Sequence, residues 1–102
     1  MNIQILQCAE VEIAEAMDYY NSQYSGLGYE FAIEVKKSLN RILSFPSAWS
    51  IFSKNIRKSM INRFPYGILY EIRNNTIIVF AVLNLKQNPK KWENKIKEYI
   101  NK

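Results

Sequence analysis

The chain has 102 residues, enough for one domain that folds unaided, so we expect a single domain spanning residues 1–102. Hydrophobic residues make up 48% of the chain and charged residues 23%, as in globular proteins, which excludes extended disorder. Histidine is absent, which excludes the commonest general base, the usual zinc ligand and every Ser–His or Cys–His nucleophile pair. The one cysteine, Cys8, is interpreted as a structural thiol, and we expect no metal and no cofactor.

The net charge of +5 is unevenly distributed along the chain. Residues 1–45 hold six acidic and three basic side chains, a balance of −3, whereas residues 46–102 hold eleven basic and three acidic ones, a balance of +8. This asymmetry indicates that the second half meets an anionic partner, either nucleic acid or an acidic protein. The alternative is a solvated basic surface with no specific partner.

No segment has the pattern of a signal peptide or a membrane span. The chain starts Met1-Asn2-Ile3, without a basic or an apolar leader region. The longest apolar run, from Thr76 to Leu83, has the length of a buried strand and is far short of a membrane helix. We therefore expect a cytoplasmic protein with no membrane partner.

The first half of the chain predicts a strand and a helical hairpin. Residues 2–6 alternate between polar and apolar and predict a short strand. Residues 9–24 and 27–45 each carry an apolar stripe at helical spacing. Ser25-Gly26 separates the two predicted helices and Pro46 ends the second. The short break predicts an antiparallel hairpin that must lie on another layer.

The second half predicts a strand meander and a last helix. Residues 47–55 are expected to be a connection, followed by strands over residues 56–63, 68–72 and 76–83. A terminal helix is expected over residues 89–101, with proline in its first turn. The predicted class is α+β: an N-terminal strand, a two-helix hairpin packed on an antiparallel sheet of about four strands, and a short C-terminal helix.

The strand at residues 56–63 is the most informative stretch for function. Arg57 and Arg63 are an even number of positions apart, so both would lie on one face of a strand. Lys58 would lie on the other face. Lys54 comes just before the strand. Two arginines on one face suit bidentate binding of phosphate or carboxylate groups. The alternative is a solvated face that pairs with acidic side chains of the helices.

A second basic cluster follows the longest apolar run. Lys86, Lys90 and Lys91 surround a predicted turn, and Trp92 anchors the helix that follows. A lysine-rich loop at a strand end is a plausible contact surface, with an ordinary charged loop as the alternative. The aromatic residues Tyr66, Tyr70 and Trp92 would suit base stacking, although aromatic residues in a small α+β domain more often belong to the core.

The ordered set of short motifs resembles the RelE/ParE toxin superfamily. The resemblance is carried by Ala16-Met17-Asp18-Tyr19-Tyr20, Gly26-Leu27-Gly28 with Glu30-Phe31, Arg41-Ile42 with Pro46, Ile56-Arg57-Lys58, Arg63-Phe64-Pro65-Tyr66 with Tyr70, and Ala81-Val82 through Pro89 to Trp92. It spans nearly the whole chain. It implies the predicted fold and a growth-inhibiting toxin of a type II toxin–antitoxin system, a class that includes plasmid stabilisation proteins, neutralised by a cognate antitoxin protein.

The family has two modes of action, and the resemblance leaves both open. One branch binds and poisons DNA gyrase, and the other cleaves ribosome-bound mRNA with basic and tyrosine side chains. Catalytic candidates for the second mode are Arg57, Lys58, Arg63, Lys86 and Tyr66. Candidates for nucleic-acid or target binding are Lys54, Arg57, Lys58, Arg63, Lys86, Lys90, Lys91 and Trp92.

Departures from the endonuclease pattern favour the gyrase-binding mode. Met60 and Gly67 stand where that branch tends to place basic residues, and Asn84 stands where the closing motif usually has histidine. A ribonuclease needs a base, an acid and cations around one phosphate. The remaining alternative is a non-toxic small basic protein that binds only its antitoxin.

Overall fold

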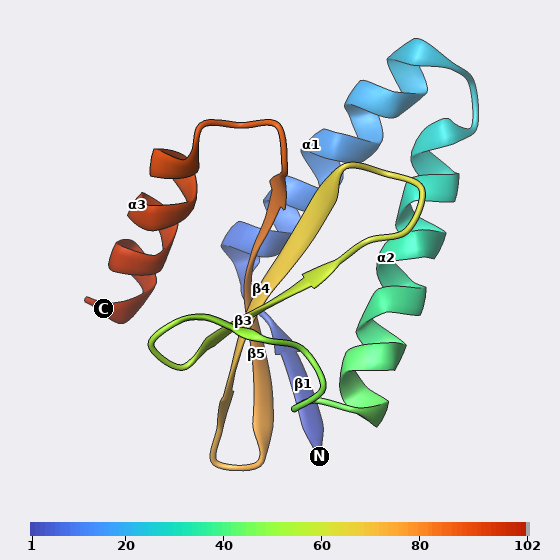
Figure 1. The fold of residues 1–102 in the computed structure, drawn as a ribbon. Coiled ribbons are helices and arrows are strands. Elements are labelled where there is room, and N and C mark those ends of the chain that lie inside the picture. The colour runs from blue at the N-terminus through green and yellow to red at the C-terminus, as the bar shows by residue number, and fades with distance from the viewer. Residues whose placement is uncertain (102) are drawn as a thin grey trace.

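A computed structural model describes residues 1–101, which form one layered α+β unit (Figure 1). Its elements are β1 (Asn2–Ile5), α1 (Gln7–Gln23), α2 (Leu27–Ser44), β2 (Ile51–Ser53), β3 (Ile56–Met60), β4 (Tyr66–Arg73), β5 (Thr76–Asn84) and α3 (Pro89–Ile100). The predicted class and the order of strand, helical hairpin, meander and last helix are confirmed. Among the described residues, no helix is long and apolar enough to cross a membrane.

The described sheet has five strands in the order β1-β5-β4-β3-β2, not the four or so expected. The additional strand, β2, lies in the segment expected to be a connection. It has three residues and an irregular register against β3, so its sequence is too short to show a strand pattern. The sheet is also mixed, because β1 pairs in parallel with β5 from Asn2↔Thr76 to Ile5↔Val79. Periodicity predicts a strand but not a partner more than 70 residues away.

The α1–α2 hairpin closes through two glycines with different roles. Gly26 has φ +88°, a left-handed conformation that side chains with a Cβ rarely adopt. Gly28 lies against the end of α1, where an added Cβ would be 2.3 Å from the carbonyl oxygen of Met17. Its backbone N–H donates to Asn21 Oδ1 at 2.8 Å. The Gly-x-Gly spacing therefore serves the tight packing of the two helices.

The sheet separates two apolar clusters. On one face, α2 contributes Phe31, Val35 and Ile42, which pack with sheet residues that include Ile68 and Ile77. On the other face, α3 packs Trp92 and Ile96 against a cluster that includes Leu69, Ala81 and Leu83. Figure 1 shows α3 and the α1–α2 hairpin on opposite sides of the strands. The last helix therefore covers the smaller of the two apolar clusters.

The strand predicted over residues 56–63 ends at Met60, three residues early. The chain then turns, with Arg63 at φ +72°, and Ile61 N–H donates to the Tyr66 carbonyl at 2.9 Å. Pro65 has no backbone N–H for a ladder, so the next strand begins at Tyr66, earlier than the expected start at Ile68. The prediction that Arg57 and Arg63 lie on one strand was therefore wrong for Arg63.

Candidate functional site

Arg57 holds the loop between α2 and β2. Its Nη1 donates to the carbonyl oxygens of Trp49 at 2.5 Å and Ser47 at 3.3 Å. In the β3–β4 ladder it lies opposite Tyr70, whose hydroxyl donates to the Pro46 carbonyl at 2.6 Å. Both side chains thus donate hydrogen bonds to backbone carbonyl groups in the segment between α2 and β2. The guanidinium group of Arg57 lies on the sheet face that carries the helical hairpin, and these bonds occupy it.

Arg63 is bound to acidic side chains of α2. Its Nη2 donates to Glu30 Oε1 at 2.7 Å, and its Nη1 lies 3.8 Å from Glu34 Oε2. The hydrogen bond to Glu30 raises the pKa of Arg63, and the charges of both glutamates add to that rise although desolvation opposes it. Glu34 is buried, so this pair neutralises a carboxylate at the edge of the core. The pairing with helix acids is the alternative foreseen from sequence.

Lys58 lies on the opposite face of the sheet, among aromatic rings of β2 and α3. Its Nζ is 4.7 Å from the ring centre of Phe52 and 5.3 Å from that of Trp92. Such contacts stabilise an ammonium group by about 0.5–2 kcal/mol. Trp92 is 5% exposed and closes this face against Gly67, so it is a core residue and offers no stacking surface. The ammonium group of Lys58 is therefore engaged by its aromatic neighbours within the fold.

Tyr66 packs in the core under the helical hairpin. Its ring centre lies 5.0 Å from that of Phe31 and 6.0 Å from that of Tyr20. The pKa of Tyr66 is raised, mainly because the phenol is buried, so the phenol is protonated at neutral pH. A buried, protonated phenol does not serve as a general base for a 2′-hydroxyl.

The remaining predicted binding residues, Lys54, Lys86, Lys90 and Lys91, are exposed. Asparagine side chains shape the loop that carries Lys86 and the start of α3, which carries Lys90 and Lys91. Asn84 Oδ1 accepts from the Lys86 N–H at 2.8 Å, and Asn88 Oδ1 accepts from the Lys90 N–H at 2.9 Å, which caps α3. The lysine side chains form none of the ion pairs found within residues 1–101. Among the predicted binding residues, these four cations are therefore the ones without contacts that occupy their charge.

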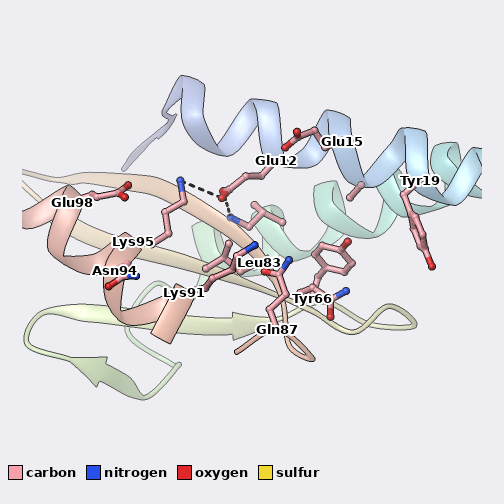
Figure 2. A pocket seen from close by; sticks show the side chains of 13 residues that line it. Glu12, Glu15, Tyr19, Tyr66, Leu83, Gln87, Lys91, Asn94, Lys95 and Glu98 are labelled. Atoms are coloured by element: carbon pink, nitrogen blue, oxygen red, sulfur yellow. Dashed lines mark hydrogen bonds and ion pairs between the residues drawn. The ribbon is translucent and has the colours of Figure 1, made fainter. Parts of the chain in front are cut away.

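A cleft of about 610 Å³ lies between α1 and α3, and the sequence analysis did not predict it. Figure 2 shows Glu12 of α1 and Lys95 of α3 reaching toward each other across β5. Their charged atoms are 3.2 Å apart, and the other oxygen of Glu12 accepts the backbone N–H of Val82 at 2.9 Å. The contacts join residues about 70 and 80 positions apart, so no local pattern could have revealed them.

The predicted catalytic residues do not converge. The sheet lies between Lys58 on one face and Arg57 and Tyr66 on the other, and Lys86 is on an exposed loop after β5. Within residues 1–101 no group of acidic, cysteine or histidine side chains is arranged to hold a metal ion. The arrangement offers a basic, partly apolar surface for binding. It does not surround one phosphate with a base, an acid and cations.

Solved structures of toxin–antitoxin proteins share this fold. A chain of the chromosomal ParDE TA system from P. aeruginosa superimposes with a TM-score of 0.76 at 9% identity, over 84% of this chain and 97% of that one. The isolated E. coli RelE toxin superimposes with a TM-score of 0.63 at 16% identity, over 96% of this chain and 97% of that one. No protein-family profile and no curated protein matches the sequence. The chain therefore has the RelE/ParE-like fold that its sequence motifs resemble.

Proposed function

We propose that this protein is the toxin of a type II toxin–antitoxin system. Its growth-inhibiting action would rest on binding an essential target, with DNA gyrase as the leading candidate, and a cognate antitoxin would neutralise it. The fold shared with the ParDE and RelE structures supports the toxin class. The ordered motifs along the chain support the same class independently of the superposition.

One observation favours binding over cleavage. The basic residues that were candidates for catalysis lie apart from one another, and their charged groups contact other parts of the fold. Arg57 and Arg63 are bound to carbonyl and carboxylate groups, and Lys58 lies under two aromatic rings on the far face of the sheet. Transition-state stabilisation of a phosphoryl group requires several donors at one point. Such a constellation would require Arg57 or Arg63 to leave its present contacts.

The exposed lysines supply the contact surface in this proposal. Lys86, Lys90 and Lys91 lie at the start of α3. Lys54 and Lys97 line a second groove, which runs between β2 and the later part of α3. Together with the +8 balance of residues 46–102, they favour an acidic protein partner or the phosphates of gyrase-bound DNA. Both partners would be held by charge and shape, without chemistry on the toxin.

The test is induced expression of the chain without antitoxin, with total RNA mapped for new 5′ ends and chromosomal DNA examined for breaks. We expect arrested growth with DNA breaks and intact mRNA. New mRNA ends at ribosome-protected positions with intact DNA would instead establish that the protein is an mRNA endonuclease. Normal growth with neither lesion would leave a non-toxic protein that binds only its antitoxin.

A matched pair of variants sharpens this experiment. Lys58→Met keeps the apolar stem between Phe52 and Trp92 but removes the charge, so a binding toxin should keep its toxicity. Replacing Lys86, Lys90 and Lys91 together by serine should abolish growth arrest without unfolding the protein, because all three side chains are exposed. The reverse pattern, with only Lys58→Met inactive, would contradict the proposal.

A further inference from the structure

The α1–α2 hairpin carries exposed apolar side chains on the side turned away from the sheet. On α2, Tyr29 is 68% exposed and Ile33 is 37% exposed, and the two lie one helical turn apart. Phe31 of the same helix is buried and faces the core. On α1, Val11 is also exposed. This surface, the hairpin face, consists of Glu10, Val11, Asp18, Tyr29, Ile33 and Lys36.

The hairpin face has acidic groups on one helix and a basic group on the other. α1 contributes Glu10 and Asp18, and α2 contributes Lys36, all of them exposed. Their side chains form none of the ion pairs found within residues 1–101. The neighbouring Lys37 differs, because its Nζ lies 3.8 Å from Glu34 of its own helix. The face therefore combines apolar side chains with charges of both signs that are free to pair with another molecule.

The basic group of α2 lies level with an acidic group of α1. Gly28 of α2 packs against the segment of α1 between Met17 and Asn21, which sets the relative height of the two helices. The helices run antiparallel (Figure 1). Lys36 comes eight positions after Gly28, so it lies level with about residues 9–13 of α1, which include Glu10.

Two hairpin faces are complementary when a two-fold axis runs parallel to the helices. Such an axis lays α1 of one copy on α2 of the other and preserves the heights of their residues. Lys36 of each copy then meets Glu10 of the other. By the same count of positions, Ile33 lies level with Ala14, a small exposed residue that leaves room for it. A two-fold axis across the helices would instead set α1 on α1 and bring acidic groups together.

We propose that the hairpin face binds a second copy of this chain and forms a two-fold symmetric dimer with four helices at the interface. The apolar side chains lose contact with water, and the pair of Lys36 with Glu10, formed twice, sets the orientation. α3 lies on the opposite side of the sheet from the hairpin, so each copy keeps its exposed lysines at the start of α3 on the outside of the dimer. The inference goes beyond the proposed function, because it requires neither a target nor an antitoxin.

Sedimentation velocity of the purified chain over a series of concentrations measures this association. We expect the dimer fraction to rise with protein concentration and to fall as salt is added, because the ion pairs lie near solvent. Ile33→Lys should weaken dimerisation by about tenfold or more, since it places a charge among apolar side chains. Ile100→Lys on α3 is the matched control, because Ile100 is 38% exposed and lies outside the hairpin face; it should dimerise as the unmodified chain does.

A charge exchange separates pairing between copies from pairing within one chain. Lys36→Glu and Glu10→Lys should each be monomeric, because like charges would meet twice at the interface. Both positions are exposed, so both variants should fold. An equimolar mixture of the two variants should dimerise, because every contact between the different chains then joins opposite charges.

Three results would overturn the inference. They are a chain that stays monomeric up to its limit of solubility, equal effects of Ile33→Lys and Ile100→Lys, and a mixture of the two charge variants that does not associate. Each of these results would leave the toxin assignment standing.

Discussion

Arg57 illustrates how a basic residue in a strand can be committed to folding. Its two carbonyl contacts, to Ser47 and Trp49, fasten the segment that leads into β2. Arg57→Ala should lower the free energy of unfolding by about 1.5–3 kcal/mol, the range for hydrogen bonds made by a charged group. Urea unfolding checks this value, with Arg57→Lys as a control that retains the charge but not the two-pronged donor. Unchanged stability with lost toxicity would place Arg57 in the target interface instead.

Tyr99 gives a prediction of pH dependence. Burial, together with the hydrogen bond that its hydroxyl donates to Glu71 at 2.7 Å, raises the pKa of Tyr99 to about 12. The unfolded phenol titrates near 10, so it loses its proton before the folded one does. Below pH 10 Tyr99 is protonated in both the folded and the unfolded protein, and its hydroxyl contributes fully to stability. Between pH 10 and about 12 this contribution to stability is lost as the pH rises.

The variant Tyr99→Phe isolates this effect. It keeps the ring that stacks on Phe80 at 4.1 Å but has no proton to lose. Its stability, measured by urea unfolding at several pH values, should decline less steeply above pH 10 than that of the unmodified protein. Equal slopes for Tyr99→Phe and the unmodified protein would contradict the account.

At the level of elements, α3 depends on a few large side chains for its position. Trp92 and Ile96 are buried against the sheet, and Trp92 also contacts Phe52 and Lys58. Trp92→Ala should cost about 3–5 kcal/mol, as for other large residues removed from a core. Thermal unfolding measures the loss, and Lys90→Ala on the same helix should change stability by less than about 0.5 kcal/mol. A small effect of Trp92→Ala would mean that α3 is not held on the sheet.

The sequence predicted elements with strong local patterns and missed those defined by distant contacts. The stripes of α1 and α2, the apolar run of β5 and the start of α3 at its proline all appear where they were expected. β2 was missed because three residues carry no periodicity. The parallel pairing of β1 with β5 depends on a partner more than 70 residues along the chain, whereas β3 ends at Met60 because the chain turns at Arg63 before β4 begins.

The candidate site was predictable in composition but not in geometry. Because Arg57 and Lys58 are adjacent in a strand, the sequence placed them on opposite faces of the sheet, as the structure has them. It could not show that Arg57 binds loop carbonyls or that Arg63 binds Glu30, because those partners lie 8 to 33 residues away. The cleft beside β5 was missed for the same reason. Residue type indicates which chemistry is available, whereas tertiary contacts decide which groups are free to perform it.

For the whole molecule, we propose that the RelE/ParE-like fold acts by binding a target and not by cleaving RNA. The most direct measurement adds the purified protein to a DNA gyrase supercoiling reaction and, in parallel, to ribosomes programmed with mRNA. We expect loss of supercoiling at toxin concentrations comparable to that of gyrase, restored by antitoxin, with the mRNA left intact. Unaffected supercoiling together with new mRNA ends in the ribosomal site would contradict it.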